Sequence, residues 1–319
     1  MALLSLQGIR VQIGETEILR GVDLEVNEGE TVGVVGESGC GKSLTALTVM
    51  GMLPSTGSIT SGSASLDGHD LTKLSQREWR SIRGTTVSMV MQDPFTSLNP
   101  MMRIGPQIAE VLIHQHGMSG RDAGNLAVEM LGKVGVPNPS AATQRFPHQL
   151  SGGQRQRVVI AIAYAAKPKL LIADEPTTAL DVTLQAQILR LIQDLQRNSG
   201  TSVLLVSHDI GVIGSVSDRV AVFYAGRVIE LGTASQVLHE PKHPYTRMLL
   251  EALPQPGVDR LASIPGAPPD FRKLPPGCSF APRCRDRFER CEKEPDGLPI
   301  AAGRSCACWK AADYANSES

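Results

Sequence analysis

Aromatic side chains are scarce in this sequence of 319 residues, where two Trp, four Tyr and six Phe make up 4%. Proteins that bind single-stranded nucleic acids usually stack bases on aromatic rings, so this scarcity argues against such a platform. A strong charge of either sign is also absent, because the formal net charge is −1. Without a bulk positive charge there is no electrostatic case for binding nucleic acid. Both absences predict a protein without a nucleic-acid partner.

Long apolar runs are missing as well. No stretch approaches the roughly 20 apolar residues that a membrane-spanning helix requires. Residues 1–6 lack the basic region and the long apolar core of a signal peptide. We therefore expect a cytosolic chain, and any work at a membrane would need a partner that spans it.

Cysteine is rare over most of the chain and concentrated at one place. Of six cysteines, Cys40 stands alone and the other five lie between positions 278 and 308. In a reducing compartment such a cluster favours metal ligation over disulfides. The remaining composition, 41% hydrophobic and 20% charged, is that of an ordinary globular protein with room for roughly two domains.

The most informative stretch follows a short apolar run at 32–35 and fits the phosphate-loop pattern G-x-x-x-x-G-K-S/T. Glycines let the backbone turn tightly and aim N–H groups inward at the start of a helix, which makes an anion cradle. In this pattern the lysine reaches the β- and γ-phosphates and the hydroxyl binds Mg²⁺. We interpret Cys40 as a small packing residue, not a nucleophile. The predicted nucleotide-binding residues are Gly36, Glu37, Ser38, Gly39, Cys40, Gly41, Lys42 and Ser43.

Two acids, Asp174 and Glu175, end an apolar segment at 169–173. In a doubly wound sheet, ligands bind at the carboxyl ends of the strands. We therefore expect Asp174 to support Mg²⁺ through water and Glu175 to polarise the water that attacks the nucleotide. The alternative is a strand that simply ends in solvent.

A second anion site is predicted at the start of another helix. Ser151 is a typical N-cap residue, and the two glycines that follow permit a close approach of the backbone to a ligand. The residues of this site are Ser151, Gly152, Gly153 and Gln154.

Alternating strand and helix patterns predict an α/β fold with a P-loop NTPase core. Period-two alternation at 3–29 predicts an antiparallel N-terminal β subdomain, and helical spacing predicts a helical insert at about 94–166. We expect an ATPase domain at 1–240, followed at 241–319 by a Pro-rich linker and a small Cys-rich metal-binding module.

The order of these motifs, with Leu-Ser-Gly-Gly-Gln at 150–154, resembles the ATP-binding subunits of ABC transporters over essentially the whole chain. The resemblance implies a homo- or heterodimer, with each ATP held between the phosphate loop of one subunit and the 151–154 signature of the other. It also implies roles for Gln92, which would touch Mg²⁺ and water, and for Asp181 in the loop that crosses the dimer. His208 would sense the γ-phosphate, and hydrolysis would make the chain an ATPase.

One position departs from the family pattern. An aromatic residue near the first hairpin usually stacks on adenine, and here that position falls at or near Ile13. No aromatic residue precedes Trp79. We expect adenine to rest on aliphatic side chains, with stacking weaker by about 1 kcal/mol and laxer nucleotide selectivity.

Three segments resemble the oligopeptide/dipeptide importer branch of this family: residues 92–100, residues 243–246 and the Cys-rich tail. The resemblance implies transmembrane permease subunits, an extracytoplasmic substrate-binding protein and a peripheral position at the cytoplasmic face of the membrane. Di- or oligopeptides are the implied cargo, although relatives carry nickel, glutathione and sugars. The alternatives are an exporter subunit and a soluble ABC ATPase acting on DNA or ribosomes. The latter usually carries a long coiled-coil insert or a second ATPase unit.

The tail cysteines match the branch pattern at four positions. Four thiolates favour an Fe–S cluster or Zn²⁺, and the resemblance points to a [4Fe–4S] cluster with a structural role. Zinc and unliganded thiols stay open as alternatives, and Cys306 could replace Cys308. The four matching residues are Cys278, Cys284, Cys291 and Cys308.

Overall fold

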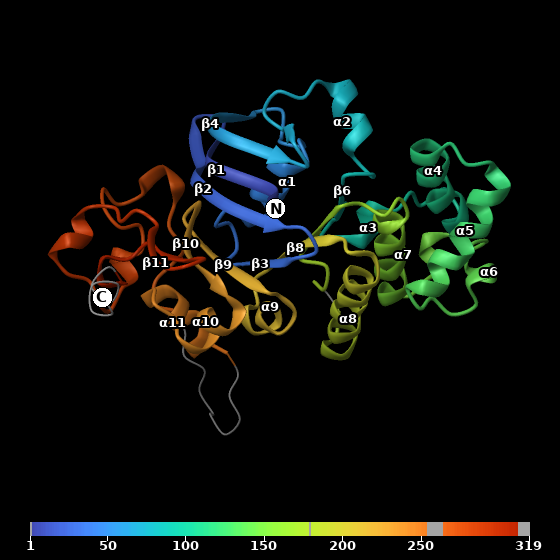
Figure 1. The fold of residues 1–319 in the computed structure, drawn as a ribbon. Coiled ribbons are helices and arrows are strands. Elements are labelled where there is room, and N and C mark those ends of the chain that lie inside the picture. The colour runs from blue at the N-terminus through green and yellow to red at the C-terminus, as the bar shows by residue number, and fades with distance from the viewer. Residues whose placement is uncertain (1, 179, 254–263, 312–319) are drawn as a thin grey trace. The chain divides into compact units, whose positions relative to one another are not determined.

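The computed structural model describes residues 2–178, 180–253 and 264–311 (Figure 1). Contacts within the chain separate two compact units. The first unit contains Asn27–Glu30 and Lys73–Leu204, and the second contains Ala2–Val26, Thr31–Thr72 and the described residues from Leu205 onward. Pro254 and Pro256 of the expected linker lie outside the described residues.

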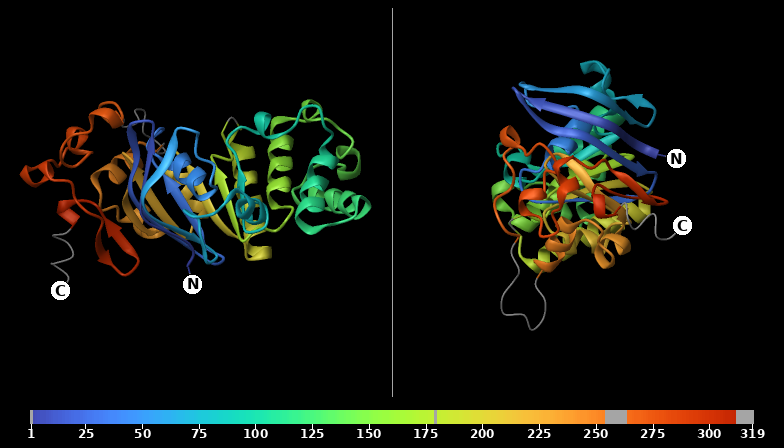
Figure 2. Two further views of the ribbon diagram at one scale, coloured as in Figure 1. Left: turned by 90° about the horizontal axis from the view of Figure 1, so that it is seen from above. Right: turned by 90° about the vertical axis from the view of Figure 1, so that its left-hand side faces the viewer.

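An antiparallel sheet opens the second unit, with its strands side by side in the order β2-β1-β4-β5 (Figures 1 and 2). Buried apolar residues alternate with exposed polar ones along β1, which confirms the predicted strand pattern. β4 begins at Gly57, because its ladder with β1 starts at the pair Ile13–Gly57. The strands are β1 (Ala2–Ile13), β2 (Thr16–Asn27), β4 (Gly57–Leu66) and β5 (His69–Asp70).

A second group of strands in this unit follows the order β11-β12-β10-β9-β3. β3 pairs in parallel with β9, and β9 pairs antiparallel with β10 around the turn at Ala225–Gly226. β12 pairs antiparallel with β10, so part of the Cys-rich tail extends the sheet. The strands are β3 (Thr31–Val35), β9 (Arg219–Tyr224), β10 (Arg227–Thr233), β11 (Leu298–Ala301) and β12 (Arg304–Cys306).

Helices of the second unit connect these strands and shape the tail. α1 is the next element after β3, and the tail contains three short 3-10 turns. The helices are α1 (Lys42–Val49), α9 (Ile210–Val216), α10 (Ala234–His239) and α11 (Pro244–Glu251), and the 3-10 turns are η2 (Phe271–Lys273), η3 (Ala281–Arg283) and η4 (Glu289–Glu292).

In the first unit β6 and β7 pair in parallel, and every residue of β7 is buried. Complete burial is typical of a strand covered on both faces of a parallel sheet. Ser75 caps α2 through a capping box with Glu78. The elements are α2 (Gln76–Ile82), β6 (Val87–Val90), β7 (Leu170–Asp174), α8 (Val182–Ser199) and β8 (Ser202–Ser207), whose last three residues belong to the second unit.

Helices fill the middle of the first unit, and within 94–166 all the described regular elements are helical. This confirms the predicted helical insert. Ile104, Ile108 and Leu112 form a buried stripe on α4, which packs against α5 and α7 (Figure 1). The elements are α3 (Pro94–Ser97), α4 (Ile104–His116), α5 (Gly120–Lys133), α6 (Pro139–Ala142), η1 (Pro147–Gln149) and α7 (Gly152–Tyr164).

Parallel and antiparallel pairings, joined by helices, confirm the expected α/β class. Within the described part of the chain, none of the helices has both the length and the apolar character to cross a bilayer.

Candidate nucleotide-binding site

The phosphate loop lies between β3 and α1, in the strand–loop–helix context that its sequence predicts. A Cβ atom on Gly36 would lie 2.3 Å from the carbonyl oxygen of Phe223 and 2.8 Å from Cys40 Sγ. Gly41 has a φ of 110°, which disfavours any residue with a side chain. The backbone therefore passes so tightly through these two positions that only glycine fits.

Lys42 is the first residue of α1, and its side chain is buried within the loop. Its Nζ donates hydrogen bonds to the carbonyl oxygens of Gly36 at 2.7 Å and Glu37 at 2.9 Å. Gly41 offers no side chain to cap this helix, and the start of a helix favours an anion. Ser43 follows in the same turn.

Cys40 is buried inside this loop. Burial raises the pKa of its thiol, and the nearby charge of Lys42 opposes that rise. Its carbonyl oxygen accepts a hydrogen bond from Gly226 N at 2.9 Å, which ties the loop to the turn between β9 and β10. A buried, protonated thiol is a packing residue, in agreement with the sequence interpretation.

The tail holds the phosphate loop through Glu37. Arg283 in η3 forms a two-point contact with this carboxylate, Nη1 to Oε2 at 2.6 Å and Nη2 to Oε1 at 2.8 Å. These bonds raise the pKa of Arg283. Tyr245 Oη also accepts a hydrogen bond from Glu37 N at 2.9 Å. Nothing in the sequence indicated this contact, because Glu37 and Arg283 are 246 residues apart and no local pattern relates them.

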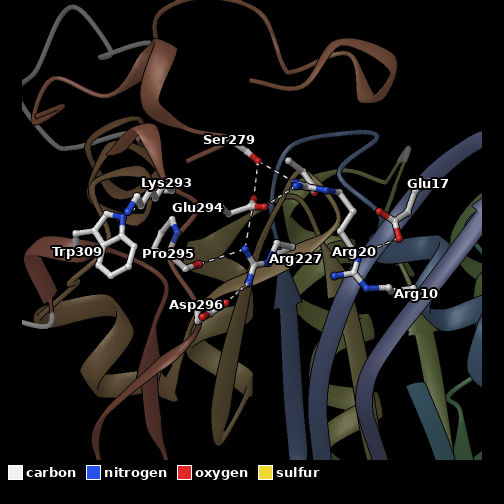
Figure 3. Close-up of polar contacts among 11 residues, drawn as sticks. Arg10, Glu17, Arg20, Arg227, Ser279, Lys293, Glu294, Pro295, Asp296 and Trp309 are labelled. Atoms are coloured by element: carbon white, nitrogen blue, oxygen red, sulfur yellow. Dashed lines mark hydrogen bonds and ion pairs between the residues drawn. The ribbon is translucent and has the colours of Figure 1, made fainter. Parts of the chain in front are cut away.

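A second contact fixes the tail to the strands (Figure 3). Arg20 of β2 and Arg227 of β10 both reach the carboxylate of Glu294, at 2.7 Å and 3.3 Å. Ser279 Oγ donates to Glu294 Oε1 at 3.0 Å and accepts from Arg20 Nη1 at 2.9 Å. Two cations and a hydroxyl thus surround one carboxylate and hold the tail in place.

Beside the phosphate loop lies a cavity of about 450 Å³. Glu37 to Cys40 form one part of its wall, and Ile13 and Ile18 form another. The tail contributes residues 268–272, including Phe271. The structure therefore places Ile13 next to the phosphate loop, and it adds Phe271, an aromatic residue that no local pattern near the first hairpin indicates.

In the first unit, Glu175 follows β7 and meets two donors. Gln92 Nε2 donates to Glu175 Oε2 at 3.2 Å, and Thr178 Oγ1 donates to the same oxygen at 2.9 Å. Gln92 and Glu175, separated by 83 residues, are thus brought together. Glu175 has a φ of 46°, a left-handed conformation that is uncommon for a residue with a side chain and clusters at functional sites. Asp174, the last residue of β7, is buried.

Ser151 caps α7 as its sequence predicts. Its Oγ accepts a hydrogen bond from Gln154 N at 3.3 Å, while Gln154 Oε1 accepts one from Ser151 N at 3.2 Å. A Cβ atom on Gly152 would have no neighbour within 4 Å, whereas one on Gly153 would contact Leu184 at 3.3 Å. Gly152 therefore leaves the start of α7 open to a close approach.

The remaining predicted residues lie at helix starts or strand ends. Asp181 caps α8 by accepting a hydrogen bond from Leu184 N at 2.9 Å, and Ala179 lies outside the described residues. His208 is exposed directly after β8, and Asp209 caps α9 beside it. Gln92, Glu175 and the 151–154 segment belong to the first unit, whereas the phosphate loop and His208 belong to the second.

Four tail cysteines line one small cavity together with His243, Phe280 and Trp309; they are Cys278, Cys284, Cys291 and Cys308. Cys306 is instead buried in β12 and is not among the lining residues. Burial raises the pKa of Cys278 to about 11. Over 2–178, 180–253 and 264–311, no three His, Cys, Asp or Glu side chains are arranged to hold a metal ion. The chemistry of the four thiols suits a soft metal.

Comparisons with known proteins match both parts of the chain. The ABC transporter family model matches residues 19–178, and the model for the oligopeptide/dipeptide transporter C-terminal region matches residues 229–291. The chain is 44% identical to the dipeptide transport ATP-binding protein DppD of Bacillus subtilis, over 96% of this chain and 94% of that protein. It is 48% identical to the oligopeptide transport ATP-binding protein AppD of the same organism, over 91% and 89%.

A solved structure supports the same grouping. The dimeric post-hydrolysis state of the ATP-binding cassette MJ0796, bound to ADP and Pi, superposes with a TM-score of 0.65 at 30% identity. The superposition covers 72% of this chain and 98% of the cassette. The α/β elements and the phosphate loop described above therefore have the arrangement of an ATP-binding cassette.

Proposed function

Because this chain belongs to the ABC transporter family, we propose that it is the ATP-binding, ATP-hydrolysing subunit that energises a membrane importer of di- or oligopeptides. The assignment to peptide import rests on the tail match at 229–291, since an ATPase domain alone is common to all branches of the family. Relatives that match over nearly their whole length bear dipeptide and oligopeptide transport names.

The phosphate loop would bind the triphosphate. Lys42 already lies inside the curve of the loop and would exchange its carbonyl partners for the β- and γ-phosphates. Gly39 and Gly41, together with Glu37, Ser38 and Cys40, would present backbone N–H groups to the same phosphates.

Glu175 is proposed as the general base that polarises the attacking water. Its hydrogen bonds from Gln92 and Thr178 fix the orientation of the carboxylate, which is the requirement for a positioned base. Ser43, Gln92 and Asp174 would hold Mg²⁺, which would neutralise charge on the phosphates. His208 is exposed at a strand end and would contact the γ-phosphate.

Complete sites would form between two subunits, identical or related. The open start of α7 at Ser151 and Gly152, with Gly153 and Gln154 behind it, suits an approach to the partner's ATP. Asp181 would lie in the loop that crosses the dimer. The solved cassette with the matching fold is dimeric, which supports this arrangement.

Transport requires further subunits. We propose transmembrane permease subunits, an extracytoplasmic substrate-binding protein that supplies the cargo, and a peripheral position of this chain at the cytoplasmic face of the membrane. The helical segment at about 94–166 would transmit closure of the ATPase dimer to the permease. In this proposal residues 1–240 form the ATPase domain, and 241–319 form the linker and the Cys-rich module.

A [4Fe–4S] cluster on Cys278, Cys284, Cys291 and Cys308 is proposed as a staple for the tail, with Zn²⁺ as the alternative. The support is that these four cysteines line one cavity while Cys306 does not. Thiolates are the common ligands of both groups. Iron, sulfide and zinc analysis of anaerobically purified protein tests the proposal, and protein without any of the three would refute it.

Purification from cell extracts separates the proposed function from its rival, a soluble ABC ATPase that acts on DNA or ribosomes. We expect the tagged chain to co-purify with membrane proteins and to show ATPase activity that the Lys42→Ala variant lacks. Co-purification with nucleic acid or ribosomes, and ATPase activity stimulated by them, would favour the rival instead.

A further inference from the structure

A nucleotide base bound beside the phosphate loop needs a surface to rest on, and the first hairpin of this chain contributes Ile13, Thr16 and Ile18 there, none of which is aromatic. Ile13 and Ile18 line the cavity beside the phosphate loop, but neither presents a flat ring. A base that contacts only aliphatic side chains loses the stacking energy that an aromatic face provides. A ring that stacks on the base would therefore have to come from elsewhere in the chain.

Two aromatic residues line that cavity, Tyr224 and Phe271. Tyr224 is 2% exposed, and its ring is packed against Tyr245 at a centroid distance of 4.7 Å and against Phe280 at 5.2 Å. Its ring is thus engaged in the core of the second unit. Phe271 is partly exposed and belongs to the segment that the tail places at the mouth of the phosphate loop.

The ring of Phe271 lies against the turn that is bonded to the phosphate loop. A Cβ atom on Gly226 would lie 3.2 Å from Phe271 Cε1. Gly226 N donates to the carbonyl oxygen of Cys40, and the Gly226 carbonyl oxygen accepts from Arg20 N, both at 2.9 Å. The loop, the strand β2 and the Phe271 ring are therefore all adjacent to one glycine.

Local hydrogen bonds order the short turn that carries this ring. Asp270 accepts a bond from Arg272 N at 3.0 Å, and its carboxylate meets the Arg272 guanidinium at two points, both at 3.1 Å. The contacts of Glu37 with Arg283 and of Glu294 with Arg20 hold the rest of the tail against the same unit. A ring held in this way loses little conformational entropy when a ligand stacks on it.

We propose that Phe271 is the base-stacking residue of the nucleotide site, supplied by the C-terminal tail in place of the aromatic residue missing at Ile13. The ligand is a purine nucleoside triphosphate, whose phosphates occupy the loop while its base enters the cavity lined by Phe271, Ile13 and Ile18. Stacking recognises the flat face of any base, so this contact strengthens ATP and GTP binding alike. The inference rests on the proposed function, because it presupposes that the phosphate loop binds a nucleotide.

Calorimetric binding to the full-length chain, carrying Glu175→Gln to suppress hydrolysis, tests the proposal. Phe271→Ala should raise the Kd for ATP and for GTP about tenfold. The Kd for inorganic tripolyphosphate, which has phosphates but no base, should not change, and this also shows that the loop is still folded. Phe271→Tyr should restore ATP binding. Phe146→Ala removes another partly exposed phenylalanine far along the sequence, and it should leave all three constants unchanged.

A spectroscopic variant gives an independent readout. Phe271→Trp should show a fluorescence change on adding ATP that is absent with tripolyphosphate, after subtraction of the signal from the two native tryptophans. Equal ATP affinity in the parent and Phe271→Ala proteins would overturn the proposal while leaving the ATPase function intact. Equal weakening of ATP and tripolyphosphate would also overturn it, since Phe271 would then support the loop and not the base. A parent protein that binds neither nucleotide would instead refute the proposed function.

Discussion

Replacing Arg283 by alanine should loosen the phosphate loop, although Arg283 and Glu37 of the loop are 246 residues apart in the sequence. The change removes both hydrogen bonds to the Glu37 carboxylate and leaves that carboxylate beside the loop without its guanidinium partner. The Glu37 backbone lies in the loop, and its carbonyl oxygen accepts a hydrogen bond from Lys42. Greater mobility of Glu37 should therefore also increase the mobility of the phosphate-binding residues.

The size of the effect follows from burial. An exposed ion pair contributes about 0–1 kcal/mol, whereas removing one partner of a buried pair costs about 3–5 kcal/mol. Here the side chains of Arg283 and Glu37 are 6% and 21% exposed, and the contact is a two-point one. We therefore expect a coupling free energy of about 2 kcal/mol, within the range for hydrogen bonds to charged groups.

Native-state hydrogen exchange measures the free energy of local opening at each amide. The measurement therefore does not require the whole chain to unfold in a single two-state transition. Amides of the loop and α1 should exchange about 30-fold faster in Arg283→Ala, which corresponds to about 2 kcal/mol. A double-mutant cycle with Glu37→Gln isolates the pair and cancels any effect on the neighbouring Cys284. Arg285→Ala removes a nearby exposed pair with Glu251 and should leave this exchange unchanged. A coupling below about 0.5 kcal/mol would refute the role given to Arg283.

Three further outcomes are expected. Glu175→Gln should lower ATP turnover about 100-fold or more and trap an ATP-bound dimer, visible by size-exclusion chromatography; near-normal hydrolysis would contradict its role as the base. Ser151→Ala should destabilise the start of α7 by about 1 kcal/mol and reduce turnover, while the Kd of the isolated subunit for ATP stays unchanged; a weakened Kd would place Ser151 at its own subunit's nucleotide. Cys308→Ala should abolish iron incorporation under anaerobic purification, whereas Cys306→Ala should retain it, because Cys308 lines the cavity shared by the four cysteines and Cys306 does not; the reverse result would exchange the two assignments.

Sequence patterns predicted the elements that depend on interactions between residues close together in the sequence. Ser151 is predictable as a cap because a capping residue acts within one helical turn, and it accepts the expected hydrogen bond. The phosphate loop was predictable for the same reason, because its glycines are required by the backbone conformation of the loop itself. The helical insert followed from its apolar spacing, which depends on the helix alone.

Contacts made by the tail were not predictable, because they join residues without any shared periodicity. β12 has three residues in a Cys-rich segment, too few to show alternation, yet it pairs with β10. Phe271 lies in a Pro-rich stretch whose composition predicts a linker, and only the fold brings it into the same cavity as Ile13. The residues near Ile13 predict an aliphatic surface, but they carry no information about a ring that the tail brings to the same cavity. The left-handed backbone at Glu175 has likewise no signal in the sequence.

Uptake of radiolabelled di- and oligopeptides by cells that lack this chain tests the central claim most directly. Uptake should be lost on deletion, restored by the intact chain, and not restored by Lys42→Ala, whose phosphate loop lacks its buried ammonium. Undiminished peptide uptake after deletion, or full restoration by Lys42→Ala, would contradict the account that ATP hydrolysis by this chain energises peptide import.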